Sequence, residues 1–64
     1  MKMWIARDAG KQGELILYTE KPYTREHGYW ECSTSCDMLP LDEDYFPEVT
    51  FENSPMEVEL VLKK

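Results

Sequence analysis

The side chains with the widest chemical range in this 64-residue chain are two cysteines, Cys32 and Cys36, and a single histidine, His27. Three residues separate the cysteines, whereas zinc and thioredoxin-like sites typically have a two-residue gap. Two thiols and one distant imidazole cannot complete a four-ligand site without carboxylates, so we predict neither a metal site nor a cofactor. We expect free thiols in a reducing cytosol; a disulfide across this tight connection is the alternative in an oxidising compartment.

The acidic run Asp42-Glu43-Asp44 suggests calcium binding. Calcium loops of the familiar type, however, need alternating oxygen ligands, a central glycine and a final bidentate glutamate, and the residues that follow lack them. We predict instead one helical turn near 42–46, with Asp42 as its N-cap and Pro47 ending it.

No catalytic residue is predicted. His27 lies beside Glu26 and Gly28 in an expected loop, where no serine or cysteine nucleophile accompanies it. Paired acids and bases also need a pocket that separates their pKa values, and a domain of this length rarely encloses one. We therefore expect a protein without enzymatic activity.

The formal charge is -6, and it is unevenly distributed along the chain. Acidic and basic residues cancel within 1–31, whereas the only cations within 32–64 are Lys63 and Lys64. Direct binding to nucleic acid needs clustered lysine and arginine, so we do not expect it. A protein partner with a basic surface is compatible with this charge. The simpler explanation is that the acidic residues keep a small domain soluble.

Runs of β-branched, aromatic and alternating residues, bounded by turn-forming residues, predict a chain built from strands. The predicted strands are 3–7, 14–20, 29–32, 48–52 and 56–62, with a short extended piece at 38–41. We expect a single domain, 1–64, with an all-β fold. Its four or five antiparallel strands run in meander order and form a sheet or a partly open barrel. An α+β fold is the alternative if 12–20 is helical.

The alternation within these segments also predicts the core. Both faces of 3–7 are expected to be covered, because its large apolar residues are adjacent and point to opposite sides. The other residues expected in the core are Trp30, Val49, Phe51, Met56, Val58, Leu60 and Leu62.

The apolar run at the amino end is far shorter than the core of a signal peptide and is followed by charge. No apolar run approaches the length of roughly 18 residues that a membrane span requires. We therefore expect a cytoplasmic protein that does not contact membranes.

Several stretches together resemble a group of short uncharacterised proteins encoded in gut anaerobes and their mobile elements or phages. They are 3–8, 15–18 with Lys21-Pro22 after it, Trp30, 46–52 and 57–60. The resemblance covers most of the chain. It implies a cytoplasmic setting and a non-enzymatic role.

The sequence thus predicts a small acidic protein-interaction module whose surface combines exposed tyrosines with carboxylates. The candidate surface residues are Tyr18, Tyr23, Tyr29, Asp42, Glu43, Asp44, Tyr45, Glu48, Glu52, Glu57 and Glu59. One alternative is an acidic inhibitor that imitates nucleic acid and occupies the basic groove of a host or defence protein. The other is a structural homo-oligomer, such as a homodimer.

Overall fold

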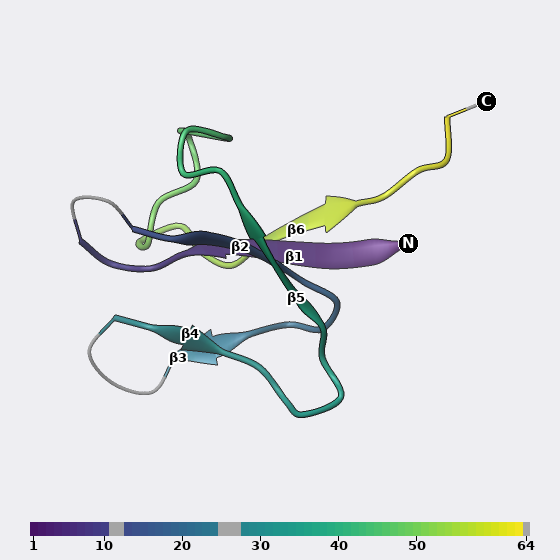
Figure 1. The fold of residues 1–64 in the computed structure, drawn as a ribbon, viewed down its shortest axis with the longest axis horizontal. Coiled ribbons are helices and arrows are strands. Elements are labelled where there is room, and N and C mark those ends of the chain that lie inside the picture. The colour runs from purple at the N-terminus through teal and green to yellow at the C-terminus, as the bar shows by residue number, and fades with distance from the viewer. Residues whose placement is uncertain (11–12, 25–27, 64) are drawn as a thin grey trace.

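The computed structural model describes residues 1–10, 13–24 and 28–63, and within them the fold is all-β with no helix (Figure 1). This confirms the predicted fold class over the α+β alternative. The strands are β1 (Lys2–Arg7), β2 (Leu15–Tyr18), β3 (Tyr23–Thr24), β4 (Trp30–Glu31), β5 (Met38–Leu41) and β6 (Met56–Glu59).

Four strands form an open antiparallel sheet in the order β5-β2-β1-β6, and β3 and β4 form a separate two-stranded hairpin. The strands β1, β2 and β5 lie side by side as a meander would place them. β6, however, returns to the far side of β1, which gives the order of a Greek key rather than a continuous meander. The sheet does not close into a barrel. β5 and β6 are its two edges.

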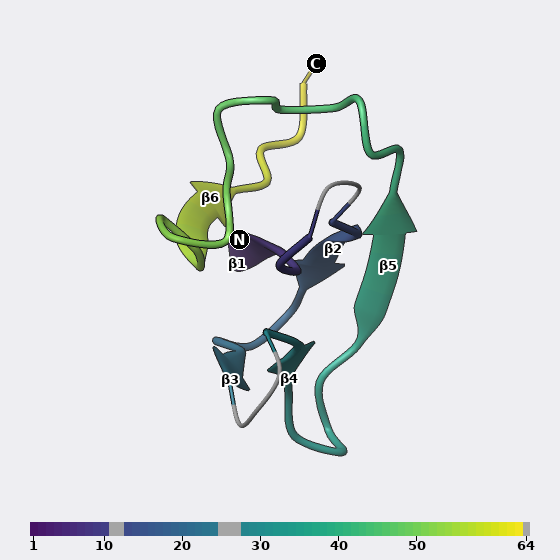
Figure 2. The same ribbon diagram turned by 90° about the vertical axis from the view of Figure 1, so that its left-hand side faces the viewer.

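The pleat of β1 and β2 divides the core into two clusters on opposite faces of the sheet. Ile5, Leu15 and Val49 form one cluster, and the segment 42–55 covers it. Ala6, Ile16 and Tyr18 form the other, on the face that the hairpin and the cysteines cover. Figure 2 shows the hairpin below the sheet and the segment that follows β5 passing above it. The prediction that both faces of the first strand are covered is confirmed.

The segment 48–52 was predicted to be a strand, and this is wrong, because it forms a series of turns. The Thr50 amide donates to Asn53 Oδ1 at 2.8 Å, and the Asn53 amide donates to Thr50 Oγ1 at 3.2 Å. Such local side-chain bonds satisfy the backbone in place of a strand ladder. The predicted burial of Val49 is nevertheless confirmed, and Phe51 is half-buried with its ring 5.8 Å from that of Trp30.

The helical turn predicted near 42–46 is also wrong. The Tyr45 amide donates to Asp42 O at 3.0 Å and the Asp44 amide to Asp42 Oδ1 at 2.9 Å, so Asp42 begins an isolated turn. The turn does not continue as a helix because Phe46 has a φ of 49° and Pro47 disfavours helical backbone in the residue before it.

The last strand is shorter than 56–62, because β6 ends at Glu59. Val58 is half-buried against the cluster of Ile5 and Leu15, as predicted. Leu60 and Leu62 are 61% and 83% exposed, so their assignment to the core is wrong, and Met56 is exposed too. The alternating pattern predicted which side of the strand Met56, Leu60 and Leu62 occupy, but no other segment packs over them closely enough to bury them.

Candidate interaction site

The side chain of Arg7, at the end of β1, holds the segment that crosses the upper face of the sheet. Its guanidinium donates hydrogen bonds to five main-chain carbonyls. They are Val49 O (2.6 Å, from Nε), Gly13 O (3.0 Å) and Glu43 O (3.1 Å) from one terminal nitrogen, and Tyr45 O (3.0 Å) and Phe46 O (3.3 Å) from the other. Four of these acceptors lie within 43–49, so one side chain fixes the path of a segment that has no regular structure of its own.

The charge of Arg7 is therefore met by carbonyl dipoles, and no carboxylate of the described residues pairs with it. This leaves the acidic side chains of the same segment free to face outward. Asp42, Glu43, Asp44 and Glu48 are all exposed, and no lysine or arginine that the structure describes forms an ion pair with them. We call 42–48 the acidic-aromatic loop.

The loop carries its two aromatic side chains on the outside. Tyr45 and Phe46 are 55% and 48% exposed, and their rings meet edge to face with centroids 6.4 Å apart. The carbonyls of both residues are bound to Arg7, and the Val49 amide donates to Phe46 O at 2.9 Å. The backbone is thus fixed from beneath, while the rings remain available to a partner.

An open depression of about 420 Å³ adjoins the acidic-aromatic loop. The residues that line it include the acidic Asp8, Glu43 and Glu52 and the apolar Pro47 and Phe51. The size falls within the usual range of ligand sites, roughly 300–1,000 Å³. Three of the lining residues are acidic, and Arg7, the lining cation, is already bound to carbonyls, so the charge of the depression favours a basic side chain over an anion. Gly13 lines it as well, and its missing side chain matters because a Cβ there would collide with Asp8 O.

Sequence reasoning did not single out Arg7, because its charge is one of many that cancel in the first half of the chain. A signal was nevertheless available. Arg7 follows Met3 and Ile5 at two-residue steps, so it lies on an inward-facing side of its strand. A charged side chain at such a position needs partners supplied by another segment.

Tyr18 was predicted as part of the interaction surface, and this is wrong. It is fully buried in the lower cluster, because the hairpin covers its face of β2. Burial, together with the nearby charges of Asp8 and Glu14, raises the pKa of Tyr18 to about 12. Its hydroxyl has no hydrogen-bond partner among the described groups.

The other predicted surface residues are exposed, but they do not form one surface. Tyr23 and Tyr29 belong to the hairpin side of the molecule, whereas Tyr45 lies on the acidic-aromatic loop. Glu52 lines the depression. Glu57 and Glu59 lie on β6, where Lys2 Nζ is 3.4 Å from Glu57 Oε1. The structure therefore brings together only the residues within 42–52.

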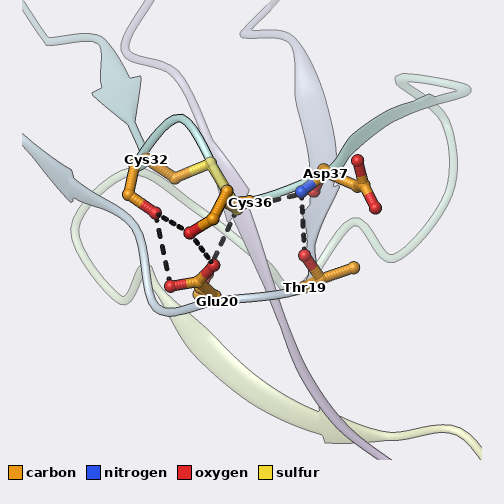
Figure 3. Close-up of a disulfide and its surroundings, with 7 residues drawn as sticks. Thr19, Glu20, Cys32, Cys36 and Asp37 are labelled. Atoms are coloured by element: carbon orange, nitrogen blue, oxygen red, sulfur yellow. Dashed lines mark hydrogen bonds between the residues drawn. A yellow bond between two sulfur atoms is a disulfide. The ribbon is translucent and has the colours of Figure 1, made fainter.

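Cys32 and Cys36 form a disulfide, so the expectation of free thiols is wrong (Figure 3). The intervening residues fold as a turn, closed by the Cys36 amide donating to Ser33 O at 3.0 Å. Hydroxyls within the turn bind Glu20, with Ser33 Oγ 3.3 Å and Ser35 Oγ 2.8 Å from its carboxylate oxygens. Beside it, Thr19 and Asp37 exchange two hydrogen bonds. Cys36 Sγ lies 3.9 Å from Glu20 O and 3.5 Å from Asp37 O, and both cysteines pack against the apolar cluster that contains Tyr18.

Within 1–10, 13–24 and 28–63, no group of three or more histidine, cysteine or acidic residues is placed to hold a metal ion. His27 lies outside the described residues, so its predicted role as a solvated loop residue stays a prediction. None of the described segments is a helix long and apolar enough to cross a membrane.

No known family model matches the chain, and no solved structure matches it either. A stretch of 44 residues, 69% of the chain, is 32% identical to part of chitin synthase A from Colletotrichum graminicola. The match covers 2% of that protein. The chain therefore spans a very small part of this relative, and the similarity does not assign it to a family.

Proposed function

We propose that this protein is an acidic protein-interaction module without catalytic activity, and that the acidic-aromatic loop binds a basic surface on a protein partner. The observation that carries the proposal is the set of five hydrogen bonds from Arg7. They hold the loop backbone in one conformation while its carboxylates and its two rings face outward.

This arrangement suits binding for two physical reasons. A loop already fixed in the free protein loses less conformational entropy on association, which leaves more of the interaction energy as affinity. Exposed carboxylates speed the encounter with a basic partner, and aromatic side chains such as Tyr45 and Phe46 are typical centres of binding energy. The depression beside the loop offers a position for a lysine or arginine of the partner.

The proposal is tested by affinity capture from a lysate with matched variants. The double variant Tyr45→Ala/Phe46→Ala and the charge reversal Asp44→Lys are each expected to abolish a capture that weakens as salt is raised. Tyr29→Ala and Asp37→Lys are the matched controls, because they remove an exposed ring and reverse an exposed charge on other surfaces. Capture that all four variants retain, or that is indifferent to salt, would count against the proposal.

The alternative of an inhibitor that imitates nucleic acid gains less support. Such a mimic needs its carboxylates in a row on one surface. Here, Asp42 to Glu48 lie above the sheet, whereas Glu57 and Glu59 share the opposite face with Lys2 and Trp4.

For the homo-oligomer, the test is sedimentation, in which a dimer would appear with rising concentration in the absence of any partner.

We also propose a cytoplasmic location, supported by the resemblance to short proteins of gut anaerobes and mobile elements. The disulfide does not favour this location, because a reducing cytosol keeps thiols free. Cell fractionation against a cytosolic marker tests the proposal, and recovery of the protein outside the cytosolic fraction would overturn it.

A further inference from the structure

We propose that the outer edge of β6 is a second binding site, independent of the acidic-aromatic loop, which accepts an extended segment of a partner with lysine or arginine at alternate positions. The partner segment would extend the sheet as a fifth strand, next to β6.

The hydrogen-bond pattern at β6 leaves its outer edge open. Met1 and Leu60 exchange two main-chain hydrogen bonds, at 2.8 and 3.0 Å, which makes them a hydrogen-bonded pair. In an antiparallel ladder such pairs alternate, so the pair of Met3 and Val58 is bonded in the same way. The amide and carbonyl groups of Glu57 and Glu59 must then point away from β1. No strand within the described residues pairs with that side of β6.

The opposite edge of the sheet, β5, contains a proline that disfavours pairing with a further strand. Thr19 and Asp37 are bonded across β2 and β5, so by the same alternation Pro40 directs its nitrogen outward. Proline has no amide hydrogen to donate and obstructs an approaching strand, which is why it occurs on edge strands. β6 has no proline, and its two outward residues retain both main-chain groups.

The charges beside β6 specify the chemistry of the incoming strand. Glu57 and Glu59 project from one face of the strand, and Val58 and Leu60 belong to the other. Glu59 has no ion pair with any described cation, and the pair of Glu57 with Lys2 is exposed to solvent. A hollow of about 470 Å³ lies here, lined by Lys2, Glu57, Val58 and Glu59. Lysines on one face and apolar residues on the other would therefore meet complementary neighbours on both.

A second copy of this chain fits the edge poorly. Pairing two antiparallel β6 strands with their faces matched places glutamates opposite glutamates, and like charges at directly opposed positions destabilise a strand pair. Shifting the register by one residue moves every side chain to the wrong face. The same glutamates that discourage self-association thus favour a basic strand, since opposite charges across two strands attract.

The test is a titration with a capped peptide of ordinary strand length that alternates lysine with valine or threonine. A control peptide has the same composition with its lysines in one block, and another carries N-methyl groups at the amides that would face β6. We expect the alternating peptide to bind and to slow hydrogen exchange at the amides of Glu57 and Glu59. Neither control should produce this protection.

Two substitutions at one position separate the charge from the main chain. Glu59→Thr removes the carboxylate and keeps the main-chain amide, and it is expected to weaken peptide binding about two- to fivefold. Glu59→Pro also removes the outward amide, as Pro40 does on the other edge, and should weaken binding by roughly a further two- to tenfold. The β1–β6 ladder does not use the Glu59 amide, so the Pro variant should remain folded. If that variant unfolds, the N-methylated peptide still tests whether main-chain hydrogen bonds contribute to binding.

Three results would overturn the proposal. One is equal affinity for the alternating and block peptides, which would show attraction by charge alone. Another is equal affinity of the Pro and Thr variants together with undiminished binding of the N-methylated peptide. The third is a dimer in sedimentation that Glu59→Pro abolishes, since the occupant would then be a second copy. The variant Tyr45→Ala/Phe46→Ala should bind the alternating peptide normally, so failure of the loop proposal would leave this one standing.

Discussion

The central sheet is covered on its two faces in different ways. Below it, the hairpin and the disulfide turn combine a short strand pair, a covalent bridge and a bridging carboxylate from Glu20. Above it, 42–55 has no strand and no covalent link. Its backbone is held by Arg7, together with local turn bonds and the burial of Val49.

The comparison shows how an irregular segment can be held in place without a strand ladder. Strands supply one another with donors and acceptors, whereas an irregular segment leaves carbonyls that another group must satisfy. One guanidinium carries five donors in a fixed plane, so it serves several carbonyls at once. Most of the contacts that hold the upper cover therefore come from one side chain, whereas the lower cover depends on several separate contributions. Substitutions should distinguish the two.

The largest effect is expected from Arg7→Met, which leaves five carbonyls without their donor. We expect the free energy of unfolding to fall by about 3–5 kcal/mol, since hydrogen bonds from a charged group are among the stronger ones. A domain of this length has a total stability of roughly 3–10 kcal/mol, so the variant should be largely unfolded or lack an ordered upper cover. Urea denaturation measures the loss, and hydrogen exchange of the Val49 amide locates it.

The conservative variant Arg7→Lys is the control for charge. An ammonium group keeps the charge but cannot reach five carbonyls spread around a planar fork, so it should restore less than half of the lost stability. Full rescue by lysine would mean that charge, and not the geometry of the guanidinium, holds the loop.

Breaking the lower cover should cost less. The double variant Cys32→Ser/Cys36→Ser opens a very short loop, for which the chain-entropy relation gives about 2 kcal/mol. Because the hairpin, Trp30 and the Glu20 contacts remain, we expect the variant to stay folded with a lower urea midpoint. Wild-type protein in reducing agent should match it. A collapse of the whole fold on reduction would show that the bridge carries the lower cover alone.

A smaller and pH-dependent effect is expected from Tyr18→Phe. The hydroxyl of Tyr18 is buried without a partner, so its removal should raise stability by about 1 kcal/mol at neutral pH. The folded pKa of Tyr18, about 12, lies above the unfolded value of 10.0. As the pH rises through that interval, the unfolded chain releases the proton first, so stability is lost with rising pH. Tyr18→Phe lacks this loss of stability. Urea denaturation of both proteins at pH values between the unfolded and the folded pKa of Tyr18 measures the difference in their free energies of unfolding.

The smallest effect should come from Glu20→Ala in the oxidised protein. Two exposed hydroxyl contacts are removed while the disulfide still holds the turn, so we expect a loss of about 0.5 kcal/mol. In the Cys32→Ser/Cys36→Ser background the same contacts hold the turn without the bridge, and the loss should be larger. Equal losses in the two backgrounds would show that carboxylate and disulfide act independently.

The parts of the fold that follow from alternation were predictable from the sequence. Three strands of the four-stranded sheet, β1, β2 and β6, and the opposite faces of Leu15 and Ile16 come from period-two patterns, which depend only on neighbours along the chain. The fourth, β5, was predicted only as a short extended piece. The turns within 48–53 were mistaken for a strand because Val49 and Phe51 alternate correctly. Their conformation is decided instead by Asn53 and by Arg7, which lies 42 residues away from Val49.

The candidate site was only partly predictable. The carboxylates and Tyr45 were identified because exposed charge and aromatic residues are visible in the sequence. Tyr18 was misplaced, since the burial of its face depends on where the hairpin docks, which no local pattern specifies. The disulfide was weighed only as an alternative, because cysteine spacing alone does not reveal whether two sulfurs meet.

Arg7 has one further property, which concerns the rate of folding. Its carbonyl accepts the indole hydrogen of Trp30 at 3.1 Å, and the Trp30 amide binds Asp8 next to it, so the residue that anchors the upper cover also receives the lower one. These contacts join positions 23 and up to 42 residues apart in the chain. Proteins dominated by such distant contacts fold slowly for their size. The two covers should accordingly open and close as one cooperative unit, with β1 as the strand on which both are assembled.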